Sequence, residues 1–236
     1  LSLLLGMLAI NSAVAAGLPD AQVVNRGPHT RVWQRVTQQT TEDGRVIQST
    51  NSYTEIATGL HYFKDGAWLD SKPRFSLFPG GAVANEGPFQ LIITPDVSAD
   101  GVVDLLTPDG KRFLSSPRWL AYYNLVTHES TMIAAVKSCI GQLVEANVVL
   151  FPDSFDAIRA AIKYTYQPWG MEQEVIIMEA GGLNPADFGM HGNPGDIVLE
   201  MWSEFLLSPE PDKSSLATVN GMNDVTLDFG EAKVGP

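Results

Sequence analysis

The sequence predicts an all-β fold: an antiparallel sandwich or an extended β-sheet assembly built of hairpins, with little helix. From residue 30 onward, short segments rich in β-branched and aromatic residues alternate with Gly, Pro, Asn and Asp, a pattern typical of strands joined by turns. Asp65-Gly66 and Asp109-Gly110 each separate two such segments, and Asp-Gly pairs favour tight hairpin turns. Apolar residues make up 44% of the chain, which is enough to build a buried core.

The first sixteen residues predict the back end of a secretory signal peptide. An uncharged apolar run from Leu3 to Ile10 leads into a stretch of small residues in which Ala13 and Ala15 have the A-x-A spacing of a cleavage site. We expect cleavage after Ala15 or Ala16, and a secreted or cell-surface protein. The run is shorter than the roughly 20 residues of a membrane-spanning helix, so no membrane span is expected. Because the chain lacks an initial Met and a basic region, we expect the true start to be missing.

The first part of the chain predicts two hairpins. Residues 31–38 alternate and are followed by a long segment, 44–56, so a hairpin is expected around Glu42-Asp43-Gly44. A second hairpin spans residues 60–69, where Asp65-Gly66 supplies the positive φ angles of a type I′ turn. Its register places Phe63 opposite Trp68 and Tyr62 opposite Leu69.

Further strands are expected along the rest of the main β domain, residues 17–180. They cover residues 89–93, 102–106, 112–114, 119–126, 131–138 and 143–150. Residues 108–111 join the second and third of these as a hairpin.

A long hairpin is expected over residues 155–179, turning at Gln167-Pro168-Trp169-Gly170. Ile158 and Ile162 also have helical spacing, and Ser154 could cap a helix. The strict alternation from residue 157 to 167 covers a longer span and favours a strand.

A Gly/Pro-rich segment, 181–195, predicts a loop or linker. Further strands are expected in residues 196–236, at 197–207 and from 225 to 230. The last of these stops abruptly, and we expect the chain to be truncated at its C-terminus.

Charge and cysteine content limit the expected partners and the role of the single cysteine. The formal net charge is −12, with a pI near 4.6. Nucleic acid is therefore not an expected partner, because polyanion binding needs clustered Lys and Arg. Cys139, the single cysteine, lies in an apolar run and is expected to be an inert core residue.

The best motif-like run predicts a calcium loop as one of two alternatives. Asp96, Ser98, Asp100 and Asp104 supply closely spaced oxygen ligands around a glycine, as calcium loops require. Thr107 stands where a bidentate carboxylate belongs, so an ordinary turn between strands is the other alternative. Calcium is the one cofactor that the sequence suggests.

Aromatic residues suggest carbohydrate binding, because aromatic faces stack on sugar rings. Trp68, Trp119 and Trp202 lie within strand patterns, where core packing is the expected role. Trp169, in a Pro-Trp-Gly turn, is the tryptophan placed like a ligand-binding residue.

No catalytic residue is nominated, and whether the chain is an enzyme is left open. The sequence lacks a nucleophile elbow, a phosphate-binding loop, a dinucleotide fingerprint and a complete zinc motif. Glu172 and Glu174 could form a hydrolytic pair, but two acids on one strand face are usually solvated.

Three segments of the chain resemble the N-terminal regions of large exported bacterial β-rich proteins, some of which continue into RHS/YD-repeat-like segments. These segments are residues 53–62, Asp65-Gly66-Ala67-Trp68 and residues 106–111. This resemblance implies the opening part of a longer secreted polypeptide and transfers no site residues. We expect a β scaffold or interaction module whose partners are other segments of that polypeptide or surface proteins. The alternatives are a carbohydrate-binding module, or a non-catalytic part of a polysaccharide-acting enzyme, and a self-standing hydrolase.

Overall fold

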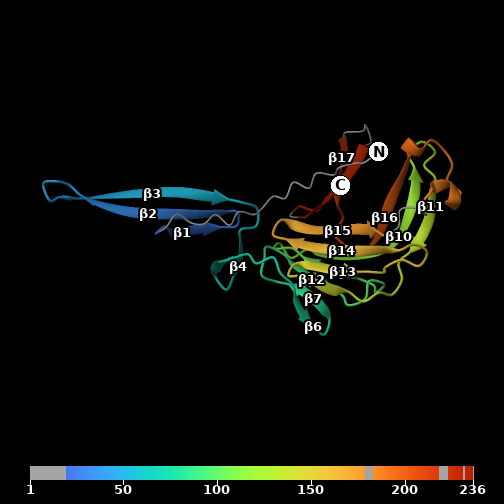
Figure 1. The fold of residues 1–236 in the computed structure, drawn as a ribbon, viewed down its shortest axis with the longest axis horizontal. Coiled ribbons are helices and arrows are strands. Elements are labelled where there is room, and N and C mark those ends of the chain that lie inside the picture. Colours follow the sequence, from blue (N-terminus) through green and yellow to red (C-terminus); the bar gives the residue numbers. More distant parts are fainter. Residues whose placement is uncertain (1–19, 179–182, 218–222, 231, 236) are drawn as a thin grey trace.

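The computed structural model describes residues 20–178, 183–217, 223–230 and 232–235, and confirms the all-β antiparallel fold. A long three-stranded arm projects from a sandwich that forms the body of the molecule (Figure 1). The expected signal peptide lies outside the described residues. Within them, no helix is long and apolar enough to cross a membrane.

The arm is an antiparallel sheet in the order β1-β2-β3, with the bounds β1 Gln22–Gly27, β2 Thr30–Thr40 and β3 Val46–Ile56. The predicted hairpin of β2 and β3 is confirmed, and its eleven residue pairs run without a bulge. β1 pairs only with residues 30–34 of β2. The outer half of the arm is therefore two-stranded in the described part of the chain.

The second predicted hairpin follows the arm as β4 (His61–Lys64) and β5 (Ala67–Asp70). Its predicted register is confirmed: Phe63 pairs with Trp68, and Tyr62 with Leu69. Asp65 and Gly66 have φ angles of 52° and 82°, as a type I′ turn requires.

The body is a sandwich of a seven-stranded and a four-stranded antiparallel sheet. The larger sheet contains β6 (Ser76–Phe78), β7 (Gly81–Ala84), β8 (Gln90–Ile93), β9 (Val103–Leu106), β10 (Arg112–Asn124), β11 (Ser130–Ala135) and β16 (Ile197–Leu207). The smaller sheet contains β12 (Gln142–Glu145), β13 (Val148–Phe151), β14 (Ala160–Gln167) and β15 (Gly170–Ile177).

β10 pairs with three other strands of the larger sheet. Along one edge it pairs with β9 over residues 112–115 and with β11 over 119–123, and along the other it pairs with β16 over 114–124. The prediction of two separate strands at 112–114 and 119–126 is wrong, because one strand continues through Pro117. Proline has no N–H to donate to a ladder. Pro117 lies between the β9 and β11 pairings, where the register with β16 also shifts.

Two further strand predictions need correction. The single strand expected at 143–150 is the β12–β13 hairpin, with a turn at Ala146 and Asn147. The Asn147 side chain donates to the Tyr166 carbonyl at 2.9 Å, which fixes this turn against β14. The strand expected from residue 155 begins only at Ala160. Buried Ser154 instead donates to the Phe151 carbonyl and accepts the Ile162 amide, so residues 154–159 form a turn.

Side chains from both sheets form one hydrophobic core. Leu91, Ile93 and Leu120 from the larger sheet and Ile162, Tyr164 and Tyr166 from the smaller sheet are each less than 2% exposed. The Tyr166 hydroxyl donates to the Phe89 carbonyl at 3.1 Å, and so links the two layers.

The loop between the sheets and the C-terminal strands both pack on the body. In residues 183–196, two short 3-10 turns (Pro185–Phe188 and Pro194–Asp196) flank the buried Met190. The last strands, β17 (Asp212–Ala217), β18 (Asn223–Asp228) and β19 (Lys233–Val234), form a separate sheet. Phe229 anchors this sheet, since its ring contacts Phe113 with a centroid distance of 4.8 Å and its carbonyl accepts Lys111 at 2.7 Å.

Tyr164 and Tyr166 make a matched test of the core. The Tyr164 hydroxyl is buried and finds no partner in the described structure, whereas the Tyr166 hydroxyl is bonded. Tyr164→Phe should leave the free energy of unfolding unchanged or raise it, and Tyr166→Phe should lower it by about 1 kcal/mol. Chemical denaturation of the two variants measures both changes; an equal loss in both would contradict this account.

Candidate functional site

The free edge of β3 is the most distinctive surface of the arm. β3 is the outer strand of its sheet, so one edge meets no other strand of the described chain. At the two ends of the β2–β3 ladder, the Ala57 amide donates to the His29 carbonyl and the Thr41 amide to the Arg45 carbonyl. Bonded and non-bonded pairs alternate along an antiparallel ladder, so the odd-numbered residues of β3 bond to β2. The even-numbered residues of β3 therefore direct their N–H and C=O groups outward.

This edge has none of the usual protection over nine residues. Residues 46–54 contain no charged residue, no proline and no glycine, and the ladder has no bulge. Val46 and Ile56, at the two ends of β3, are 62% and 75% exposed. Natural proteins protect edge strands with charges, prolines or bulges, because an open edge pairs with other chains. A long, unbulged and uncharged edge of this kind is suited to accept another strand.

The arm is electrically neutral, whereas the rest of the chain is acidic. Residues 20–58 hold four basic residues (Arg26, Arg31, Arg35 and Arg45) and four acidic ones (Asp20, Glu42, Asp43 and Glu55). The net charge of −12 therefore belongs to the residues outside the arm.

A polar network around the buried His61 ring holds the base of the arm against the β4–β5 hairpin. The His61 ring is 1% exposed, and its Nε2 lies 3.1 Å from an Asp70 carboxylate oxygen. Arg31 donates to that same Asp70 oxygen at 2.8 Å and to Glu55 at 3.1 Å. The Trp33 indole N–H donates to Glu55 at 3.0 Å. Because these groups come from the arm and from the β4–β5 hairpin, the network fixes the arm relative to that hairpin.

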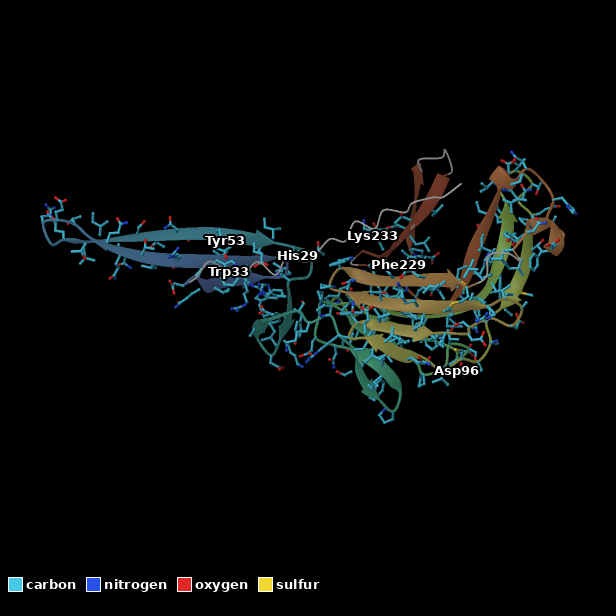
Figure 2. The ribbon with its side chains drawn as sticks, viewed as in Figure 1. His29, Trp33, Tyr53, Asp96, Phe229 and Lys233 are labelled. Atoms are coloured by element: carbon cyan, nitrogen blue, oxygen red, sulfur yellow. The ribbon has the colours of Figure 1, made fainter. Side chains whose placement is uncertain are left out.

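Trp33 and Tyr53 form a stacked pair on one face of the arm (Figure 2). Their ring centroids are 5.9 Å apart and their planes differ by 9°. The pair joins β2 to β3 across the sheet, since the two residues are direct neighbours in the register. The pair adds a side-chain contact between β2 and β3 in the inner half of the arm. In the outer half, β2 and β3 pair without β1.

Trp169, the ligand-binding residue expected from the sequence, is 60% exposed at the tip of the β14–β15 hairpin. The turn contains only Pro168 and Trp169. An added Cβ at Gly59 would lie 2.3 Å from the Pro168 carbonyl oxygen, so this turn packs closely against the segment that connects β3 to β4. Trp169 therefore lies in a turn that packs against the base of the arm.

A second aromatic surface was not predicted. Trp119 and Trp202 face each other across β10 and β16 and stack with centroids 5.9 Å apart and planes 25° apart. Trp202 is 43% exposed, so the expected core role is wrong for this residue. Its indole N–H donates to Glu200 at 3.1 Å. The alternation of Trp119 with buried Leu120 already indicates an outward face, but the cross-strand neighbour cannot be read from the sequence.

The three carboxylates of the expected calcium loop are bonded to separate partners. Asp100 pairs with Arg118 at 2.8 Å, and Asp104 forms two hydrogen bonds with Arg112 at 2.8 and 2.6 Å. Asp96 accepts the Ser98 amide and hydroxyl, each at 2.9 Å. A cation would therefore have to displace a guanidinium or a local turn contact. In the described residues, no three His, Cys, Asp or Glu side chains form a group that could hold a metal ion.

Asp96 instead fastens the loop to a neighbouring segment. The Ser138 hydroxyl donates to it at 2.5 Å and the Cys139 amide at 3.2 Å. The hydrogen bond from Ser138, followed by the Ser98 amide, lowers the pKa of the Asp96 carboxyl to about 2. Cys139 itself is half-buried and packs against the core.

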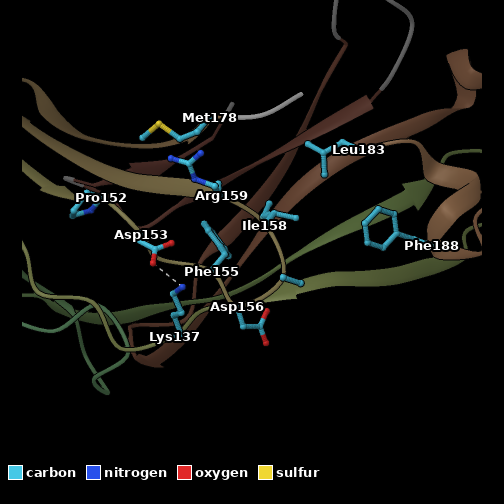
Figure 3. Close-up of a pocket in the computed structure, with 11 residues that line it drawn as sticks. Lys137, Pro152, Asp153, Phe155, Asp156, Ile158, Arg159, Met178, Leu183 and Phe188 are labelled. Carbon is cyan, nitrogen blue, oxygen red and sulfur yellow. Dashed lines mark ion pairs between the residues drawn. The ribbon is translucent and has the colours of Figure 1, made fainter. Parts of the chain in front are cut away.

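Two candidate features remain: a cavity beside β14 and the acidic pair Glu172 and Glu174. A cavity of about 660 Å³ is lined by charged and apolar residues, among them Lys137, which pairs with Asp153 at 2.8 Å (Figure 3). Another lining residue, Asp156, accepts the Ala135 amide at 2.9 Å. Glu174 pairs with Lys163 on the outer face of the smaller sheet, two residues from Glu172. We assign no chemistry to the cavity or to the Glu172 and Glu174 pair.

No family model, no curated protein and no solved structure matches this chain. The functional assignment therefore rests on the surfaces described above.

Asp96 predicts a defined acid sensitivity. A carboxyl whose pKa is lower in the folded than in the unfolded chain stabilises the fold above its unfolded pKa. This contribution should be lost as the pH falls from about 4 to about 2, the range between the ordinary value of 3.8 and that of Asp96. Asp96→Ala should lower the free energy of unfolding at pH 7 by about 1–3 kcal/mol and flatten its pH dependence in that range. Denaturation curves at several pH values measure both effects; an unchanged pH profile would contradict the assignment.

Proposed function

We propose that this chain is a secreted or cell-surface β scaffold module whose arm binds an extended polypeptide segment by strand addition. The observation that carries the proposal is the open, uncharged edge of β3, with the backbone groups of its even-numbered residues directed outward. In strand addition, backbone hydrogen bonds supply the affinity and the alternate side chains supply the specificity.

The expected partner is an extended segment with few charges, because residues 46–54 offer no charge to pair with. Such segments would come from other parts of the same long polypeptide or from surface proteins. The resemblance to exported bacterial β-rich proteins and the predicted signal peptide support export of the module. Anionic partners are not expected, because the acidic body would repel them.

Proline substitution on each edge of the arm tests strand addition. Thr50→Pro removes an outward N–H of β3 without breaking a bond to β2 and places a ring on the edge. Gln38→Pro is the matched control, because Gln38 pairs with Gln48 and directs its N–H to the opposite edge. The probe is a fluorescent, capped peptide with the sequence of residues 46–56, and anisotropy measures its binding.

We expect Thr50→Pro to weaken peptide binding by about tenfold or more, a loss of at least ~1.4 kcal/mol, and Gln38→Pro to leave it unchanged. Strand addition at β3 is wrong if the unaltered chain does not bind the peptide, or if both variants bind it equally.

The Trp119–Trp202 pair favours glycan binding as a second candidate function. Two stacked indoles, one of them 43% exposed, with a carboxylate held beside them, form an exposed aromatic surface with a polar group. Surfaces that combine aromatic faces with a few fixed polar groups are typical of small-ligand sites. Trp169 offers a separate, single exposed indole.

A glycan array with two tryptophan variants tests this second function. If the pair is the platform, Trp202→Ala should abolish binding to any glycan that the unaltered chain recognises, while Trp169→Ala should bind it normally. The reverse result would move the site to Trp169. Binding that requires calcium would implicate the Asp96 loop, and no binding by the unaltered chain would exclude the glycan proposal.

A further inference from the structure

We propose that the strand added to β3 is β3 of a second copy of this chain, so that the two arms form one continuous antiparallel sheet about a two-fold axis. The inference rests on the proposed function and names the partner. A two-fold interface uses the same surface on both subunits, so β3 must be complementary to itself.

The backbone geometry of β3 meets this condition. In an antiparallel pair, outward groups must meet outward groups, so even-numbered residues of one copy must lie opposite even-numbered residues of the other. The centred register satisfies this: Thr50 lies opposite Ser52 and Gln48 opposite Thr54, and all eleven residues of β3 are paired. A shift by one residue would place even-numbered residues opposite odd-numbered ones, whose N–H and C=O groups already bond to β2 of their own copy. A shift by two would leave residues at the ends of each β3 without a partner.

The side chains along the seam are compatible with this register. Val46 of each copy lies opposite Ile56 of the other, and these are strongly exposed apolar residues at both ends of the strand. Apolar cross-strand pairs stabilise a sheet. The single charged residue of β3, Glu55, faces Ile47 of the second copy and is already bonded to Arg31 and Trp33. No like charges meet across the interface.

The charge distribution favours this surface over others for self-association. Two copies of an acidic protein repel each other, but the arm is neutral. In an antiparallel pair the tip of each arm lies at the base of the other, so the bodies stand at opposite ends of the shared sheet. Eleven residues of strand span about 36 Å at roughly 3.3 Å per residue. This separation far exceeds the screening length of about 8 Å at physiological salt, so repulsion between the bodies is small.

Cysteine cross-linking tests both the partner and the register in the full chain. In the centred register Asn51 lies opposite itself at a non-bonded pair, where Cα atoms are about 4.5 Å apart, within the range for a disulfide. Ser49 lies on the same face and, like Asn51, is exposed, but it lies opposite Tyr53 of the second copy. Both variants, Asn51→Cys and Ser49→Cys, are made with Cys139→Ser to remove the native thiol.

We expect Asn51→Cys to form a disulfide-linked dimer on mild oxidation and Ser49→Cys to stay monomeric on a non-reducing gel. Sedimentation of the unaltered chain should show a concentration-dependent dimer that Thr50→Pro loses and Gln38→Pro keeps. Equal cross-linking of the two cysteine variants, or a dimer that persists in Thr50→Pro, would overturn the inference.

The outcomes separate this inference from the proposed function. If the chain remains monomeric at its highest soluble concentration but binds the 46–56 peptide, strand addition holds and the second copy is wrong. If it neither dimerises nor binds the peptide, both are wrong.

Discussion

The pairing of β10 on both of its edges is the constraint on which the body depends. One edge serves β9 and β11 in succession and the other serves β16, so a single strand joins the first and last parts of the larger sheet. This is feasible because Pro117, which cannot donate a hydrogen bond, lies where one partner ends and the next begins. Leu120 and Tyr122 of β10 both belong to the core, and Tyr122 also contacts the loop that precedes β16, through the Leu183 carbonyl and the Phe188 ring.

The arm follows a different physical logic from the body. Beyond its base, which contacts the β4–β5 hairpin, the arm has no second layer in the described structure, and a two-stranded hairpin without such a layer is only marginally stable. Its base is instead held by polar contacts: buried His61 lies beside Asp70, and Arg31 lies between the carboxylates of Asp70 and Glu55. The arm is a neutral sheet that projects from an acidic body. Its edge exposes backbone N–H and C=O groups rather than charges, so it can form hydrogen bonds with a further strand.

Local features of the sequence predict the hairpins well and the sheets poorly. Asp65-Gly66 determines both a turn and the register around it, because both depend on adjacent residues. The exposure of Trp169 likewise follows from its place in a two-residue turn. By contrast, the continuity of β10 through Pro117 and the exposure of Trp202 depend on strands far away in the sequence. The open edge of β3 also escapes prediction, because local periodicity does not reveal which strand ends a sheet.

The arrangement around β10 also implies an order of folding. β9 and β11 are joined to β10 by short connections, whereas β16 begins more than seventy residues after β10 ends. Closing a long loop costs more chain entropy than closing a short one, and distant pairings slow folding. The β9–β10 and β10–β11 hairpins should therefore form first, with β16 joining late. During synthesis, the second edge of β10 would stay open until residues 197–207 emerge, which makes that interval the one most exposed to misassembly.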